Sequence, residues 1–141
     1  MSEFALPNDA NTHGDVLGGK VMHLMDLSAA MTAYRHCRKP VLTISVDSLR
    51  FLHPVPIGSL MIFEAAITRA FTTSMEILVE VYTEDVLTGV RKKTCAGYLT
   101  FVAIDRNRRP SAVPPVKPES EIEKKRFEEA LLRRELRLKK V

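Results

Sequence analysis

The segment that decides the fold is residues 18–36, which read GGKVMHLMDLSAAMTAYRH. Met, Leu and Ala are strong helix formers and dominate this segment. It is apolar almost all the way round, so we expect a helix that is buried on most of its sides. Asp26 is the only charged residue between Lys20 and Arg35. Because burying an ionised carboxylate is costly, Asp26 is a candidate functional residue.

A polar, glycine-rich turn, residues 11–19 (NTHGDVLGG), leads directly into this segment. The backbone N–H groups of Gly18 and Gly19 would lie at the helix N-terminus, where the helix dipole is positive. Such N–H groups can stabilise an oxyanion in a transition state. The side-chain amide of Asn11 is a further hydrogen-bond donor, although a turn residue of this type often has only a structural role.

The sequence period changes from helical to two after Pro40, which predicts strands. In residues 75–82 the side chains of Met75, Ile77, Val79 and Val81 face one side, and those of Glu76 and Glu80 face the other. A proline-rich stretch, 105–118, separates the last strand from a second predicted helix, which begins with a Ser120/Glu123 capping box. The predicted strands are residues 41–51, 60–70, 75–82 and 91–104, and the second helix is residues 121–139. The fold class is therefore α+β, an antiparallel sheet wrapped around a central helix.

Composition limits the function classes. The chain has 141 residues, of which 45% are hydrophobic, as expected for one globular domain. No apolar run is long enough to span a membrane, and the N-terminus lacks a signal-peptide pattern. Cys37 and Cys95 have neither a metal-binding nor a paired spacing, which favours reduced thiols and a cytoplasmic protein. His23 and Asp26 could both touch a metal, but two ligands are weak evidence, so we expect none.

The net charge of +4 is concentrated in the C-terminal tail. Residues 117–141 contain nine Lys or Arg and six Glu residues. A tail with this mixture and without interleaved aromatic residues is not typical of nucleic-acid binding. We expect the tail helix to lie on the domain or on a neighbouring subunit.

Several segments together resemble the hotdog-fold acyl-CoA thioesterases of the YciA and cytosolic acyl-CoA hydrolase group. Their order and spacing carry the resemblance, which extends from about Pro7 to Glu129. The segments are Asn11–Gly19, Leu24–Asp26, Arg35–Cys37, Thr43–Asp47, Phe51–Val55, Gly58, Thr73–Ile77, Thr100–Asp105 and Glu123–Glu129.

The resemblance implies a hotdog acyl-CoA thioesterase domain, which we place in residues 1–107. The proline-rich linker, residues 108–118, and the charged C-terminal helix, residues 119–141, follow it. The resemblance implies that acyl-CoA is hydrolysed to a fatty acid and coenzyme A, with no cofactor beyond the coenzyme A of the substrate. It also implies that Asn11 of one chain meets Asp26 of another across a subunit interface. The spacing of these residues alone is equally compatible with a site within one chain. The amide N–H groups at the start of the helix make Gly18 or Gly19 the candidate oxyanion donor. The assembly that the resemblance implies is a dimer, further assembled as a trimer of dimers.

Within this interpretation Asp26 acts either as a general base or as a nucleophile. The phosphates of coenzyme A require hydrogen-bond donors or cations, and the candidates are Thr73, Ser74, Arg91, Lys92 and Lys93. Two alternatives remain. One is a domain that binds acyl-CoA without hydrolysing it, and the other is a hotdog dehydratase, for which His23 is not suitably placed.

Overall fold

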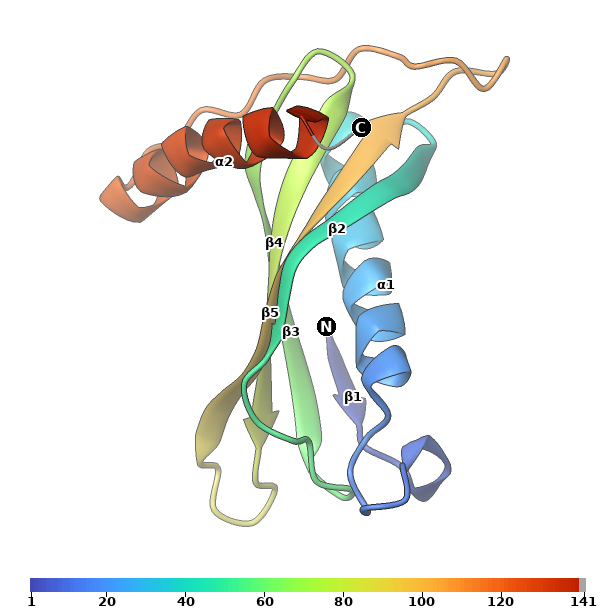
Figure 1. Cartoon of the computed structure of the whole chain (residues 1–141), viewed down its shortest axis with the longest axis vertical. Helices are drawn as coiled ribbons and strands as arrows, with labels where there is room; N and C mark the ends of the chain where they lie inside the picture. Colours follow the sequence, from blue (N-terminus) through green and yellow to red (C-terminus); the bar gives the residue numbers. More distant parts are fainter. Residues whose placement is uncertain (140–141) are drawn as a thin grey trace.

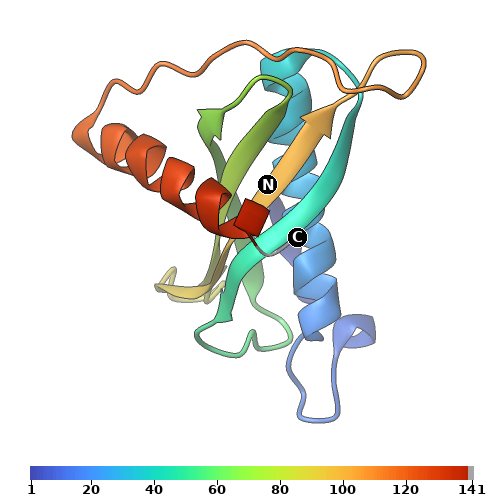
Figure 2. The ribbon, with the colours of Figure 1, turned by 45° about the horizontal axis from the view of Figure 1, so that its top comes forward.

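The computed structural model describes residues 1–139 of the chain. Five strands form one antiparallel sheet in the order β1-β3-β4-β5-β2, and it wraps around the long helix α1 (Figure 1). A second helix, α2, crosses the opposite face of the sheet (Figure 2). The elements are β1 (Ser2–Phe4), a short 3-10 helix η1 (Pro7–Asp9), α1 (Gly18–Cys37), β2 (Val41–Phe51), β3 (Leu60–Ala70), β4 (Ser74–Glu84), β5 (Arg91–Ala103) and α2 (Glu121–Lys139).

The central helix and the four long strands confirm the predicted α+β fold. One strand was not predicted: β1, which pairs with β3 through Ser2, Glu3 and Phe4. Its three residues have no hydrophobic alternation, so the sequence carries little signal for it. The edges of the sheet are therefore β1 and β2, and β2 is eleven residues long.

The core lies between α1 and the inner face of the sheet. Small residues such as Ala29 and Ala33 are fully buried and allow the helix to approach the strands closely. The helix ends where Arg38 adopts a left-handed conformation (φ 54°) and its N–H donates to the Tyr34 carbonyl. Among residues 1–139, no helix combines the length and the apolar character that crossing a bilayer requires.

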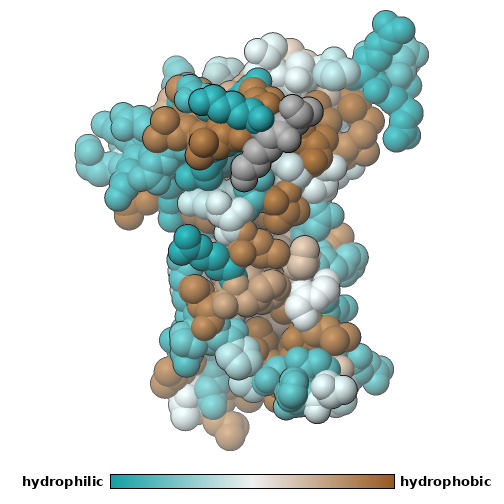
Figure 3. All heavy atoms as spheres, viewed as in Figure 1, coloured by the Kyte–Doolittle hydropathy of each residue, from teal (hydrophilic) through white to brown (hydrophobic). Residues whose placement is uncertain are grey.

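The prediction that α1 is buried on most of its sides is wrong for the isolated chain. Four large apolar residues of the helix are 40–51% exposed: Met22, Leu27, Met31 and Tyr34. The neighbouring edge strand β2 also exposes Leu42, Ile44 and Val46. Figure 3 shows apolar side chains in the region where β2 crosses α1. We call these seven residues the α1–β2 apolar face.

The outer face of the sheet carries α2, which is attached by arginines. Arg133 makes a bidentate ion pair with Glu76, and its Nη2 lies 2.7 Å from Oε1. Arg137 donates to Asp47 of β2 at 2.8 Å, and Arg126 contacts Glu80 of β4. The predicted Ser120/Glu123 capping box is present at the start of α2. The C-terminal helix therefore packs on the domain of its own chain, although Lys140 and Val141 lie outside the described residues.

Candidate active site

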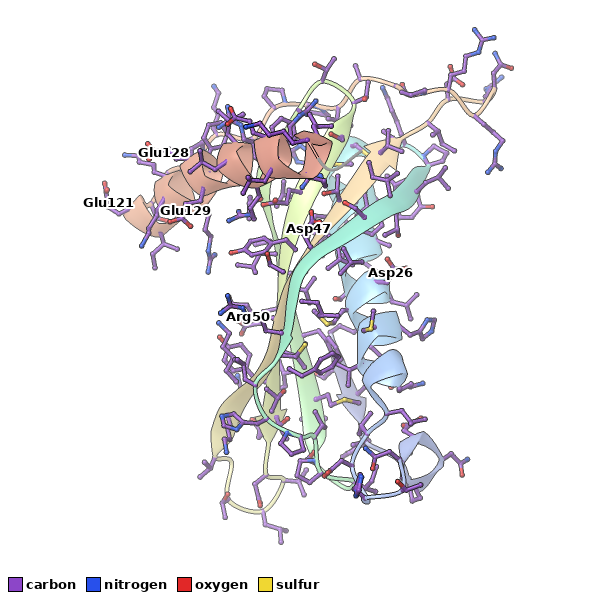
Figure 4. All side chains as sticks on the ribbon, viewed as in Figure 1. Asp26, Asp47, Arg50, Glu121, Glu128 and Glu129 are labelled. Carbon is purple, nitrogen blue, oxygen red and sulfur yellow. The ribbon has the colours of Figure 1, made fainter. Side chains whose placement is uncertain are left out.

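Asp26 lies on α1, on the side of the sheet opposite α2, whereas Asp47 and Arg50 of β2 project from the α2 side (Figure 4). The side chain of Asp26 is half-buried. Its Oδ1 accepts a hydrogen bond of 2.7 Å from Thr43 Oγ1. Within residues 1–139 the carboxylate of Asp26 forms no ion pair, and Thr43 is its only hydrogen-bond partner. An aspartate that only stabilised the fold would be expected to have a cationic partner or more donors.

A mainly apolar hollow of about 300 Å³ lies beside Asp26. It is lined by Gly19, Met22, His23, Met25, Asp26, Thr43, Val46, Leu49 and Leu99. We call it the Asp26 hollow. A carboxylate at the edge of such a hollow can react with a polar group whose apolar substituent enters the hollow.

Thr43 is the site residue that the sequence reasoning did not assign. A strictly alternating strand could not direct Thr43, Val46 and Leu49 to one hollow, because they are spaced by three residues. The pairing of β2 with β5 has register shifts between Thr43 and Ser45 and between Asp47 and Arg50. Each β-bulge of this kind re-aims the following side chains, and together they bring the three residues to the Asp26 hollow.

Asn11 holds the turn before α1 and still has a free donor. Its side-chain Oδ1 accepts hydrogen bonds from the backbone N–H groups of His13 (2.8 Å) and Asp15 (3.1 Å). Its own N–H donates to the Asp15 carbonyl at 2.7 Å, so the loop is tightly fixed. Within residues 1–139, the Nδ2 amide of Asn11 has no hydrogen-bond acceptor. The arrangement therefore presents a positioned N–H donor.

The two glycines open α1 without a side-chain cap. The N-cap residue is Leu17, and no side chain caps the helix. Within the described chain, the N–H groups of Gly18 and Gly19 have no acceptor, as expected for a first turn. Gly19 lines the Asp26 hollow, and Gly18 lines a second hollow, which also contains Asn11. Both glycines thus remain candidate oxyanion donors.

Within one chain the structure does not bring Asn11 and Asp26 together. Asp26 lies eight residues after Gly18, a rise of about 12 Å along the helix, whereas Asn11 precedes the helix. The two residues line separate hollows. A single site containing both therefore requires a second chain.

The five predicted phosphate-binding residues lie at two ends of the sheet. Thr73 and Ser74 are at the start of β4, and Arg91 is paired with Glu84 at its end. Eleven residues of β4 separate the two groups by roughly 33 Å. Within one chain, the two groups are therefore too far apart to bind the same phosphate group.

The three cations also differ in their availability. Arg91 Nε donates to Glu84 at 2.8 Å, and Lys93 pairs with Glu80. The hydrogen bond with Glu80 raises the pKa of the Lys93 ammonium above its ordinary value. Lys92 has no ion-pair partner in residues 1–139, which leaves it the most available cation of the three. Among the same residues, no group of three or more His, Cys, Asp or Glu side chains is arranged to hold a metal.

The sequence pattern of the thioesterase superfamily matches residues 13–90. A Bacillus subtilis protein named uncharacterized acyl-CoA thioester hydrolase YkhA is 42% identical over 117 residues, covering 83% of this chain and 68% of that protein. A crystal structure of an apo-hexameric acyl-CoA thioesterase matches with a TM-score of 0.95 and 38% identity, over 99% of this chain and 90% of that chain.

An acyl-CoA hydrolase from Staphylococcus aureus, solved in complex with butyryl coenzyme A and coenzyme A, matches with a TM-score of 0.92 and 36% identity. The match covers 99% of this chain and 85% of that one. Its alanine variants at one asparagine, one aspartate and one threonine have also been solved. The asparagine lies 15 residues before the aspartate, and the threonine lies 17 residues after it. Asn11, Asp26 and Thr43 have the same types and the same spacing.

Proposed function

The chain belongs to the thioesterase superfamily, and on that premise we propose that Asp26, Asn11 and Thr43 form its catalytic site. The protein is an acyl-CoA thioester hydrolase, which converts acyl-CoA to a free fatty acid and coenzyme A. One observation carries the assignment of the site. The only carboxylate in the Asp26 hollow has no cationic partner in the described chain and is held by Thr43.

Asp26 activates the attacking group. Thr43 donates to Oδ1 and leaves Oδ2 free to receive a proton or to attack the acyl carbon. On the first route Asp26 takes a proton from water, the water oxygen bonds to the acyl carbon, and the C–S bond breaks. The sulfur of coenzyme A then takes the proton from Asp26. On the second route the carboxylate displaces the sulfur, and water hydrolyses the resulting anhydride.

The two routes differ in the fate of the water oxygen. Water hydrolyses the anhydride at one of its two carbonyl carbons. If it attacks the carboxyl carbon of Asp26, the nucleophilic route places labelled oxygen in the side chain during a single turnover in labelled water. The general-base route places it only in the fatty acid. Labelled oxygen in the Asp26 side chain after one turnover, detected by mass spectrometry of the protein, would therefore establish the nucleophilic route.

Asn11 and the glycine amides stabilise the developing oxyanion. The Nδ2 amide of Asn11 is fixed by the turn and has no acceptor in the described chain. A donor of this kind contributes about 3–4 kcal/mol to transition-state stabilisation. Because Asn11 and Asp26 line separate hollows of one chain, we assign the working site to Asn11 of one subunit and Asp26 of another. A dimer then carries two equivalent sites.

A second copy of the chain covers the α1–β2 apolar face. This face combines exposed apolar residues with an unpaired edge strand, and both favour association. Two-fold symmetry would place the same face on both subunits, which suits a self-complementary apolar surface. The dimers assemble further into a hexamer, as in the structurally similar apo-hexameric thioesterase.

The phosphates of coenzyme A bind at the surface, and Lys92 is the strongest of the five candidates because no carboxylate among residues 1–139 is paired with it. Arg91 and Lys93 could contribute only by leaving Glu84 and Glu80. Thr73 and Ser74 would serve a different part of the molecule or another subunit. We also propose that the protein is cytoplasmic, since Cys37 and Cys95 are both free and buried.

The test is release of free thiol from a series of acyl-CoA substrates. Asp26→Ala and Asn11→Ala should each lose most of kcat. The matched controls are Glu128→Ala and Asn107→Ala, which remove an exposed carboxylate of α2 and an exposed amide of the turn after β5; neither residue lines the hollows of Asn11 and Asp26. Near-wild-type turnover by Asp26→Ala or Asn11→Ala would refute the site assignment. Binding of acyl-CoA without thiol release by the wild-type protein would indicate a sensor.

A further inference from the structure

The interior end of the Asp26 hollow is closed by tightly packed apolar side chains. Met25 and Leu99 are each 2% exposed, and Leu49 packs against the core beside them. Leu49 follows Ser48, which adopts a left-handed conformation (φ 52°) within the second register shift of β2. This unusual backbone directs Leu49 inward, while Arg50 projects from the other face (Figure 4).

Gly97 of β5 shows how little space remains behind Leu49. A Cβ atom built on Gly97 would lie 3.1 Å from Leu49 Cδ1 and 3.3 Å from Met25 Cε. Both distances are shorter than ordinary van der Waals contact between carbon atoms. Leu49 and Met25 therefore already occupy the volume that a side chain at position 97 would fill, and the hollow ends at these two residues.

The chemistry of the substrate decides which of its parts enters this hollow. Acyl-CoA has a phosphorylated nucleotide at one end and a hydrocarbon chain at the other, with the thioester between them. Apart from Asp26, His23 and Thr43, the hollow is lined by apolar residues and Gly19, so it suits the hydrocarbon chain and not the phosphates. With the thioester at Asp26, the acyl chain points toward Leu49.

Resting on the proposed function, we infer that Leu49 sets the upper limit on acyl-chain length. Its side chain forms the end of the acyl pocket together with Met25. Both occupy the space that is left open because Gly97 has no side chain. Shortening Leu49 opens the space over Gly97 to further methylene groups. Adding a methyl group at position 97 displaces Leu49 and Met25 toward the hollow and shortens the pocket.

The experiment measures kcat/KM for acyl-CoA substrates from acetyl to palmitoyl in the wild type, Leu49→Ala and Gly97→Ala. One methylene group in an apolar pocket changes kcat/KM by about tenfold or more. Leu49→Ala should raise the long-chain to short-chain ratio by at least that factor, and Gly97→Ala should lower it. Leu78→Ala is the matched control, because Leu78 is also a leucine of the sheet, 7% exposed, but lines a separate hollow on the α2 side.

The outcomes separate this inference from the proposed function. A wild type that hydrolyses no acyl-CoA contradicts the proposed function. A wild type with a clear chain-length profile that Leu49→Ala leaves unchanged, or shifts no further than Leu78→Ala does, overturns the role of Leu49. If Gly97→Ala does not fold, the comparison of Leu49→Ala with Leu78→Ala still decides the matter.

Discussion

Replacing Arg133 by methionine should destabilise the protein strongly, because it would leave the Glu76 carboxylate buried without a partner. Glu76 has no solvent exposure, and Arg133 donates to it from Nε (3.0 Å to Oε2) and from Nη2 (2.7 Å to Oε1). Thr68 donates a further bond of 2.7 Å, and Arg137 lies 3.9 Å away, so neither replaces the bidentate pair. Removing one partner of a buried pair costs about 3–5 kcal/mol.

Arg133 also lies over the ring of Tyr98, 3.7 Å from its centroid. The loss of this contact adds about 0.5–1 kcal/mol, so the expected total is at the upper end of the range. A loss of this size is a large part of the 5–15 kcal/mol that typically stabilises a domain. The prediction is therefore a large shift of the unfolding transition.

Urea unfolding at a fixed protein concentration measures the effect, since dissociation of subunits would otherwise change the midpoint. Arg134→Met is the matched control, because Arg134 contacts Phe71 and has no ion-pair partner among residues 1–139. It should cost less than about 1 kcal/mol. The double variant Glu76→Gln with Arg133→Met should recover most of the loss, since no buried charge then remains. A cost for Arg133→Met no greater than for Arg134→Met would refute the reasoning.

Three further predictions concern the site, the interface and a buried thiol. Thr43→Val should lower kcat by about tenfold or more with a smaller change in KM, because a hydrogen bond to a charged group is worth about 1.5–3 kcal/mol. Thr43→Ser should retain most of the wild-type rate, and full activity of Thr43→Val would contradict the role of Thr43. Ile44→Asp should convert the assembly to monomers, as measured by light scattering, and should abolish activity; an intact oligomer would exclude Ile44 from the interface. Burial raises the pKa of the Cys95 thiol to about 11, so the thiol is almost entirely protonated at pH 8. Iodoacetamide should therefore label Cys95 only after unfolding, and rapid labelling in the native protein would contradict its burial.

The secondary structure followed from the sequence where local signals were strong. The apolar helix, the four long strands and the capping box at Ser120 and Glu123 all have clear local patterns, and each is present. The sequence also pointed to Asp26, because a charged residue stands out in an apolar helix. These features depend on residues that are neighbours in the chain.

Features that depend on distant contacts could not be predicted. Alternation in β4 placed Glu76 on the outer face, but no pattern indicated that α2 would bury it completely with Arg133. The role of Thr43 depends on register shifts in β2, which have no sequence signature as clear as a glycine or proline. The exposed apolar residues of α1 are of the types found in a core, so the sequence alone could not separate burial within a chain from burial between chains.

The central claim, a site formed by Asn11 of one subunit and Asp26 of another, is tested most directly by mixing two inactive variants. Asn11→Ala and Asp26→Ala are unfolded together, refolded and assayed for thiol release. Random association gives heterodimers in which one of the two sites is intact, so activity should return to about a quarter of the wild-type value. Each variant refolded alone should stay inactive. A mixture no more active than the separate variants would contradict the shared site.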